Sequence, residues 1–279
     1  MCCTTGDFAA EIRPSRGSVD IDTALFGWRA MEIAVAGGTG IAGSEVVRIA
    51  QQRGHRVRVL TRGNGIDVRS GDGLDKVLAG TDVVIDVLSI ATQSARASTE
   101  FFTRSSSHLL SAGHRVGVQH HLALSIVGVD RAPHGYYAGK LAQEQAVQSG
   151  QIPWSIQRVP QFHDFAAQTY RAASFGPLHL AVRMRTQPIS IVEVATRLVD
   201  LAEGGPAGRA RDLAGPREEQ LVDMMRAWAE HTGRKGWMPA VSLPGAFGRA
   251  IRDGSVLPDQ DAELATVTFT DWLNAQPRG

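Results

Sequence analysis

A glycine-rich turn at residues 37–43 constrains the fold of this chain more than any other segment. It reads Gly-Gly-Thr-Gly-Ile-Ala-Gly, and its glycines at 38, 40 and 43 satisfy the pattern G-x-G-x-x-G. The apolar residues 31–36 before it predict a short buried strand, and residues 44–50 after it continue in a helical pattern. A strand, a glycine turn and a helix start in this order are typical of a dinucleotide site.

The glycines of this turn have separate physical reasons to be there. One permits a tight turn, one lets the backbone approach a pyrophosphate, and Gly43 lets the helix pack closely on the strand. The unpaired N–H groups at the start of the helix then attract phosphates. We therefore expect Gly37, Thr39, Gly40, Ile41 and Gly43 to bind a dinucleotide. The alternative is a plain glycine turn between a strand and a helix.

The composition fits a folded protein that has no special surface for nucleic acid. The 279 residues allow one large α/β domain or two small ones, and a hydrophobic share of 43% is ordinary for a globular chain. Lysine plus arginine (29) almost balances aspartate plus glutamate (28), so we expect no nucleic-acid partner. No run of about eighteen apolar residues occurs, so we expect no membrane span. The oligomeric state stays open.

Residues 1–30 do not match the pattern that follows them. They lack the apolar core of a secretory signal, and their acidic residues argue against a transit peptide. Because Met31 stands directly before the first strand, we expect a loosely held extension that reflects an upstream start in the gene model. The alternative is that residues 21–28 dock on the body. The only cysteines, Cys2 and Cys3, are adjacent and form no disulfide framework, which favours a reducing, cytoplasmic location.

Strands and helices alternate over the first part of the chain, which is the pattern of βαβ units in a doubly wound parallel sheet. We predict strands at residues 31–36, 55–60, 66–68, 82–88, 118–126 and 154–158, and helices at residues 44–50, 74–78, 96–112 and 136–149. The strand at residues 82–88 is apolar enough for a sheet that is covered on both faces.

Beyond residue 160 this alternation loosens. We predict short strands at residues 188–191 and 211–214, helices at residues 192–202, 217–231 and 259–274, and a segment rich in glycine and proline at residues 233–258. The fold class is therefore α/β, with a dinucleotide-binding Rossmann core over residues 31–160. A smaller substrate-specificity lobe over residues 161–279 belongs to the same domain and closes over the strand ends, where ligands bind.

From residue 31 to the C-terminus the chain resembles an atypical, extended member of the short-chain dehydrogenase/reductase superfamily, of the NAD(P)H-binding, NmrA-like type. The glycine turn carries this resemblance together with Val-Arg-Val-Leu-Thr-Arg at residues 57–62 and Tyr-Tyr-Ala-Gly-Lys-Leu-Ala-Gln-Glu at residues 136–144. Residues 153–158, 187–195 and 212–216 support it. The resemblance implies an oxidoreductase that uses NAD(P)H to reduce a small carbonyl, enone or quinone.

The resemblance also implies catalytic roles for Tyr136, Lys140 and Ser125. A tyrosine and a lysine four residues apart lie on one face of a helix. In the family the lysine holds the nicotinamide ribose and lowers the pKa of the tyrosine, so that the phenol exchanges a proton near neutrality. Ser125 ends the preceding strand and resembles the serine that polarises the substrate carbonyl. Tyr137 follows Tyr136 directly, so which of the two phenols faces the cofactor stays open.

The end of the second predicted strand indicates which cofactor binds. An NAD enzyme usually has an acidic residue there, whereas this chain has Thr61 and Arg62. An arginine binds a 2′-phosphate through paired N–H donors, so we expect NADP(H) in preference to NAD(H). The alternative is that Arg62 is a solvated loop charge. Asp72 matches the family's turn at the adenine edge or is a simple turn aspartate, and Ser89 lies close to the cofactor by its position after a strand.

Two other functions remain open from the sequence. A regulatory protein that senses NADP(H), as NmrA-like proteins do, needs the fold and the dinucleotide but has no use for a proton donor. A nucleotide-sugar epimerase or dehydratase shares the fold and the tyrosine, but normally retains NAD, which Thr61 and Arg62 disfavour. His120 and His121 have no cysteine or carboxylate at ligand spacing, so we expect no metal.

Overall fold

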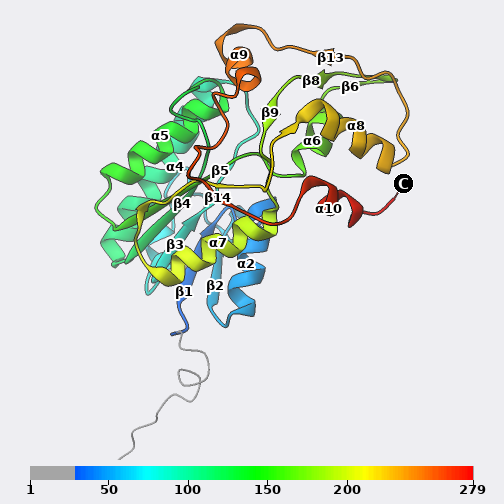
Figure 1. Ribbon diagram of the computed structural model, residues 1–279. Helices are drawn as coiled ribbons and strands as arrows, with labels where there is room; N and C mark the ends of the chain where they lie inside the picture. Colours follow the sequence, from blue (N-terminus) through cyan, green and yellow to red (C-terminus); the bar gives the residue numbers. More distant parts are fainter. Residues whose placement is uncertain (1–28, 279) are drawn as a thin grey trace, which may run out of the picture.

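The computed structural model describes residues 29–278 and has three layers, with a parallel β-sheet between two layers of helices (Figure 1). The six strands lie in the order β10-β5-β4-β3-β1-β2, and every neighbouring pair is parallel. They are β1 (Glu32–Ala36), β2 (Arg56–Leu60), β3 (Val83–Asp86), β4 (His120–Ile126), β5 (Trp154–Val159) and β10 (Gly208–Arg209). The predicted doubly wound α/β fold is confirmed.

The direction in which the sheet grows reverses at β1. The chain passes from β1 to β2 on one side and then returns to place β3 on the other, so that Ala36 pairs with both Leu60 and Asp86. Such a reversal opens a crevice outside the carboxyl ends of the strands, and ligands of doubly wound sheets bind in it. The glycine turn follows β1 at this point.

The two faces of the sheet pack into two separate apolar cores. Ile33, Val35 and their neighbours in other strands pack against one helix layer, whereas Ala34 and Ala36 face the other. The first layer consists of α2 (Ile41–Gln52) and α7 (Ile191–Gly204), and the second of α3 (Leu74–Leu78), α4 (Ala95–Val116) and α5 (Tyr136–Ser149). Because strands of this kind are covered on both faces, their sequences are almost continuously apolar.

Most of the chain after β5 forms a smaller lobe around its own apolar core (Figure 1). Its helices are α6 (Phe165–Ala172), α8 (Leu221–His231), α9 (Gly245–Asp253) and α10 (Phe269–Asn274). Its short strands are β6 (Ser174–Phe175), β7 (Leu178–His179), β8 (Ala181–Val182), β9 (Arg185–Thr186), β11 (Leu213–Ala214), β12 (Glu219–Gln220), β13 (Ala240–Val241) and β14 (Glu263–Leu264). Two elements beyond residue 160 instead join the main sheet: β10 is its sixth strand, and α7 covers one of its faces.

Several predicted elements are wrong in place or extent. Residues 66–68 form no strand, because a 3-10 helix (η1, Arg62–Asn64) turns the chain and directs Ile66 and Val68 into the core beside α3 and α4. Residues 188–191 contribute only an isolated bridge, between Phe162 and Ile189.

The predicted C-terminal helix is also much too long. Of residues 259–274 only α10 is helical, because Thr268 and Asp271 form a reciprocal capping box that starts a helix at Phe269. Residues 263–264 instead extend as β14 beside β11. The predicted helix at residues 217–231 likewise begins later, at Leu221, after the short strand β12. The glycine- and proline-rich segment contains a helix, α9, that periodicity did not indicate.

The extension expected over residues 1–30 lies almost entirely outside the described residues, as do both cysteines. In residues 29–278 no helix combines the length and the apolar character that crossing a membrane requires.

Helices α4 and α5 approach each other closely at Gly139. A Cβ atom at this position would lie 2.0 Å from the Oγ atom of Ser98 in α4 and 2.6 Å from the carbonyl carbon of Ser98. The Ser98 hydroxyl donates a hydrogen bond of 3.0 Å to the backbone oxygen of Tyr136, which fixes the first turn of α5 on α4. The glycine therefore sets where α5 begins relative to the sheet.

We expect Gly139→Ala to lower the free energy of unfolding by about 1–3 kcal/mol, because the added methyl group must push α4 and α5 apart. Urea denaturation measures this change. Gly204→Ala is the matched control, since Gly204 ends α7 and a Cβ atom there meets nothing within 4 Å. Equal unfolding midpoints for the two variants would contradict the expectation.

Candidate functional site

The glycine turn lies directly against the end of β3. Gly37 has a φ of +86°, in the left-handed region, and a Cβ atom on it would lie 2.8 Å from the carbonyl oxygen of Val87. A Cβ atom on Gly43 would lie 2.1 Å from the carbonyl oxygen of Gly37. Only glycine fits both the conformation at the first position and the close approach at the second.

Helix α2 begins immediately after this turn and presents an open N-terminus. Gly40 is its N-cap, no side chain of the described residues caps it, and its first turn holds no acidic residue. The first N–H groups of a helix have no partner inside the helix, and together with the helix dipole they favour an anion. A Cβ atom on Gly40 would meet only the carbonyl oxygen of Gly37, at 3.2 Å, so the backbone is open to a bound group. These features fit the diphosphate of a dinucleotide.

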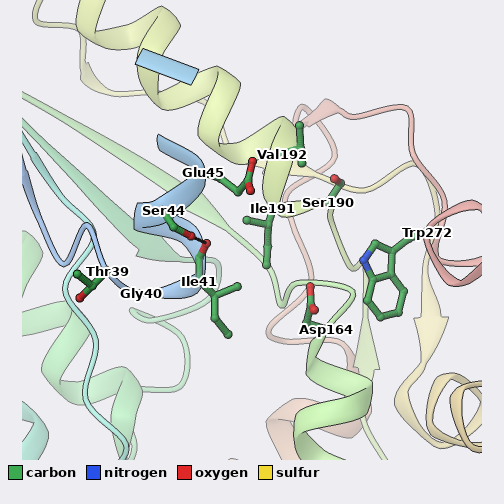
Figure 2. Close-up of a pocket in the computed structure, with 10 residues that line it drawn as sticks. All are labelled: Thr39, Gly40, Ile41, Ser44, Glu45, Asp164, Ser190, Ile191, Val192 and Trp272. Atoms are coloured by element: carbon green, nitrogen blue, oxygen red, sulfur yellow. Dashed lines mark hydrogen bonds between the residues drawn. The ribbon is translucent and has the colours of Figure 1, made fainter. Parts of the chain in front are cut away.

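A cleft of about 480 Å³ opens beside the start of α2 (Figure 2). One wall comes from the glycine turn and α2, and the other from the segments around α7, α6 and α10. The lining residues are Thr39, Gly40, Ile41, Ser44, Glu45, Asp164, Ser190, Ile191, Val192 and Trp272. Figure 2 shows Ile41 and Ser44 on one side of the opening and Asp164 and Ile191 on the other. The cleft therefore joins the turn to the C-terminal lobe.

The sequence predicted that the part of the chain beyond residue 160 closes over the strand ends, but it did not identify which of its residues line this cleft. Asp164 has one available signal, because it follows β5 at the edge where ligand-facing loops begin. Burial raises the pKa of its carboxyl group. Trp272 lies more than a hundred residues further along the chain, in α10, and no motif in the sequence singled it out.

The segment after β2 brings Arg62 to the same edge of the sheet. Leu60 pairs with Ala36, so the residues after each of them leave the sheet side by side. The Thr61 side chain accepts a hydrogen bond of 3.2 Å from the backbone N–H of Asn64 and so starts η1. The Arg62 side chain is exposed and forms no ion pair or hydrogen bond within residues 29–278. Its guanidinium group is therefore available to an anion.

Asp72 is exposed in the turn before α3. Its backbone N–H donates to the Oγ atom of Ser70 at 3.3 Å. In the described part of the chain no hydrogen bond ties its carboxylate to the glycine turn or to Arg62.

Tyr136 is the first residue of α5, so Tyr136 and Lys140 lie one turn apart on the same helix. The hydroxyl group of Tyr136 lies 3.1 Å from the Oγ atom of Ser89. Ser89 follows β3 closely, and Val87 of the same segment touches Gly37. A continuous row of contacts therefore runs from the glycine turn, through the end of β3, to the phenol.

Tyr137 points elsewhere, into the core of the C-terminal lobe. Its side chain is 6% exposed, its hydroxyl group accepts a hydrogen bond of 2.7 Å from Gln161, and its ring packs edge-on against Phe247. Burial raises the pKa of Tyr137 to about 12. Of the two adjacent phenols, Tyr136 is therefore the one that lies beside Ser89.

The pKa of Tyr136 departs from what the resemblance implies. Burial raises it, the hydrogen bond with Ser89 lowers it in part, and the nearby Asp86 raises it further. The resemblance implies instead that Lys140 lowers this pKa. In the structure the Lys140 ammonium donates to the backbone oxygen of Leu124 at 2.5 Å and to the side-chain oxygen of Gln143. Tyr136 is consequently a protonated phenol at neutral pH.

Ser125 does not join the phenol in this structure. It lies in β4, is 1% exposed, and its hydroxyl group has no hydrogen-bond partner among residues 29–278. The hydroxyl group that contacts Tyr136 belongs to Ser89, which is exposed. Of the predicted site residues, the structure thus brings together the glycine turn, Ser89, Tyr136 and Lys140, and leaves Ser125 inside the sheet layer.

The paired histidines are buried at the start of β4. His120 lies 2.9 Å from the Oγ atom of Ser155, and burial lowers its pKa to about 4. His121 is fully buried, and burial lowers its pKa too. Across residues 29–278 no group of three or more histidine, cysteine, aspartate or glutamate side chains is placed to hold a metal ion.

Comparison with known proteins finds a family match within the first part of the chain. Residues 33–149 match the model of the NAD dependent epimerase/dehydratase family. Among curated proteins no match is found. The resemblance to extended short-chain dehydrogenases is thereby confirmed, whereas the NmrA-like type is not specifically matched.

Several solved structures share the fold. The NADPH-dependent quinone oxidoreductase of Escherichia coli is 15% identical and superposes with a TM-score of 0.62 over 87% of this chain and 98% of that one. Citrobacter sp. triphenylmethane reductase, solved with NADP(H), is 17% identical with a TM-score of 0.58 over 81% and 89%. A dTDP-4-dehydrorhamnose reductase from Clostridium acetobutylicum is 15% identical with a TM-score of 0.63 over 76% and 84%. At these identities the likeness shows the Rossmann-type fold.

We expect Gly43→Ala to weaken dinucleotide binding at least tenfold, or about 1.4 kcal/mol, because the methyl group would force the turn away from α2. Titration calorimetry with NADPH and NADH measures the change. Gly204→Ala again serves as control, and circular dichroism confirms that the variant is folded. Wild-type affinity in a folded Gly43→Ala variant would show that the turn does not hold the dinucleotide.

Proposed function

We propose that this chain, whose residues 33–149 match the NAD dependent epimerase/dehydratase family, is an NADPH-dependent reductase of a small carbonyl, enone or quinone substrate. The row of contacts from the glycine turn to the phenol carries this proposal. Gly37 touches the end of β3, Ser89 follows it, and the Tyr136 hydroxyl meets Ser89 with Lys140 one helical turn on. This row would place a proton donor beside the reactive end of a dinucleotide whose phosphates bind at α2.

The residues of the turn fit the diphosphate of such a cofactor. Gly37 and Gly43 allow the close packing that shapes the turn, Gly40 keeps its backbone open, and the start of α2, with Thr39 and Ile41, supplies N–H donors.

Arg62 is the residue that would select NADPH. It stands at the sheet edge beside the turn with its guanidinium group unpaired among the described side chains, and paired N–H donors suit a 2′-phosphate. Asp72, in the following turn, would lie at the adenine edge. Lys140 and Ser89 would face the nicotinamide ribose.

When bound, NADPH supplies a hydride to the electrophilic carbon of the substrate. Tyr136 would donate its phenolic proton to the oxygen of the substrate as negative charge develops there. The raised pKa of Tyr136 keeps this proton in place until that charge appears. Carbon thus gains a hydride and oxygen a proton, and the phenol regains its proton from solvent. Ser89 would orient the phenol, a position that the resemblance gives to Ser125.

The C-terminal lobe would set which substrate is accepted. The lobe contributes Asp164 and Trp272 to the cleft, and the start of α7 adds Ser190, Ile191 and Val192, so one indole ring and two aliphatic side chains face two polar groups. Walls of this mixed kind suit a small, mostly apolar molecule with a few polar groups.

A nucleotide-sugar epimerase or dehydratase is the second candidate, and the family that residues 33–149 match favours it. Such an enzyme retains tightly bound NAD through its cycle. Absorbance of the purified, denatured protein reveals retained nucleotide, and NAD in equal amount with the chain would favour this candidate over the reductase.

We expect Arg62→Ala to weaken NADPH binding by roughly tenfold or more and to leave NADH binding nearly unchanged, because a charge-assisted hydrogen bond contributes about 1.5–3 kcal/mol. Fluorescence titration with both cofactors measures the two dissociation constants. Arg104→Ala, which removes an exposed arginine from α4, is the matched control. Tighter binding of NADH than of NADPH by the wild-type chain would overturn the assigned preference.

We expect Tyr136→Phe to lower kcat by at least about a hundredfold, since general acid catalysis typically contributes that much or more. Tyr137→Phe should retain most of the turnover but lose about 1 kcal/mol of stability, because it leaves the Gln161 amide without its acceptor. NADPH oxidation is followed with a panel of quinones, aldehydes and enones, and stability by urea denaturation. Unchanged turnover in Tyr136→Phe would remove this residue from the mechanism.

A further inference from the structure

A group of polar side chains is buried between the sheet and α5, beneath the site. Asp86 ends β3 and is 0% exposed, and Gln143 of α5 is equally buried. The Gln143 amide nitrogen donates a hydrogen bond of 2.8 Å to Asp86 Oδ2, and Asp86 Oδ1 accepts the backbone N–H of Leu88 at 3.1 Å. The other end of the Gln143 amide accepts a hydrogen bond from the Lys140 ammonium. A carboxylate, an amide and an ammonium are thus linked in one hydrogen-bonded series.

The chemistry of this hydrogen-bonded series allows only one orientation of the Gln143 amide. A carboxylate only accepts hydrogen bonds and an ammonium only donates them. Reversing the amide would place two acceptors together at Asp86 and two donors together at Lys140. The Gln143 amide therefore ties the Lys140 ammonium to Asp86 through two hydrogen bonds.

The geometry points to Asp86 and Gln143 as positioning residues for Lys140, holding its ammonium charged and aimed toward the cofactor side of the site. An ammonium has three N–H donors, and the backbone oxygen of Leu124 and the side chain of Gln143 engage two of them. Within residues 29–278 the third donor forms no hydrogen bond, and we assign it to the ribose, which would have to approach beside the Phe102 ring that covers the ammonium. That last step rests on the proposed function.

Burial makes such support necessary. Lys140 is 3% exposed, and burial lowers its pKa to about 8, while the charges of Asp86 and Glu144 raise it. Without a carboxylate nearby, a buried lysine tends to lose its proton and with it one N–H donor. Phe102 of α4 covers the ammonium, with the ring centroid 4.7 Å from Nζ.

The other ionisable groups around Lys140 do not replace Asp86. Glu144 of α5 forms a two-pronged ion pair with Arg158 of β5, which engages its carboxylate. His121 of β4 has its Nε2 atom 3.9 Å from Asp86 Oδ2, and burial lowers its pKa, so it is neutral near pH 7. Tyr136 is protonated at that pH. Asp86 is therefore the anion that acts on Lys140 through a hydrogen-bonded partner.

The sequence offers a direct way to observe Lys140. Lys76, Lys140 and Lys235 are its only lysines, and the other two are exposed. Full-length protein labelled with 13C- and 15N-lysine therefore gives three side-chain signals, which Lys76→Arg and Lys235→Arg assign. The exposed lysines serve as internal references in a pH titration by NMR.

We expect the pKa of Lys140 to fall by roughly one pH unit or more in Asp86→Asn, because the supporting carboxylate is lost. Gln143→Met, which keeps the length of the side chain but removes its oxygen, should lower it as well. In the double variant the pKa of Lys140 should fall no further than in the single variant with the larger shift, since the two residues act through the same hydrogen-bonded series. Gln145→Met, which changes an exposed residue of the same helix, should leave the pKa of Lys140 unaltered.

Unchanged titration of Lys140 in folded Asp86→Asn or Gln143→Met protein would overturn the inference, and either variant suffices if the other fails to fold. The titration needs neither cofactor nor substrate. A chain that reduces no acceptor but shows the expected shifts would therefore refute the proposed function and retain the positioning role. At pH 8 the same variants should bind NADPH several-fold more weakly than wild type. Equal affinity would show that the third N–H donor of Lys140 does not bind the ribose.

Discussion

The contact between the glycine turn and the end of β3 is the constraint on which the rest of the site depends. Gly37 can lie against Val87 only because it has no side chain and accepts a positive φ. That contact brings the start of α2 and the segment containing Ser89 to one edge of the sheet. A larger residue at position 37 would separate the proposed phosphate-binding end of the site from the phenol, although the glycine turn and α5 could each still form.

A second constraint is the burial of charge beside that edge. The sheet and α5 enclose Lys140, and an enclosed ammonium is stable only with oxygen partners and a nearby anion. Asp86 interrupts an otherwise apolar strand for this reason, and Gln143 carries its influence across to α5. Gly139, next to Lys140, lets α5 approach α4 closely enough to close the compartment. Packing and electrostatics therefore act on the same helical turn.

Much of the Rossmann part could be predicted from the sequence, because each buried parallel strand is a short apolar run beside a periodic helix. The C-terminal lobe could not, since each of its short strands has only two residues and most are held by partners distant in the chain, as β14 is by β11. Local propensity does not reveal such pairs. The error at residues 66–68 has the same origin. Ile66 and Val68 are apolar because they pack against a helix layer, and not because they belong to a strand of the sheet.

The backbone of the candidate site was predictable where a motif fixes its local conformation, as at Gly37 and Gly43. The direction of the side chains was uncertain where neighbouring residues are of the same type. Tyr136 and Tyr137 are identical in type, and helical geometry separates their directions by about 100°. Tertiary contacts decide which core receives each ring: Phe247 and Gln161 take Tyr137 into the lobe, which leaves Tyr136 at the sheet edge. The C-terminal lobe therefore determines which phenol reaches Ser89, and this dependence is invisible in the spacing of the motif itself.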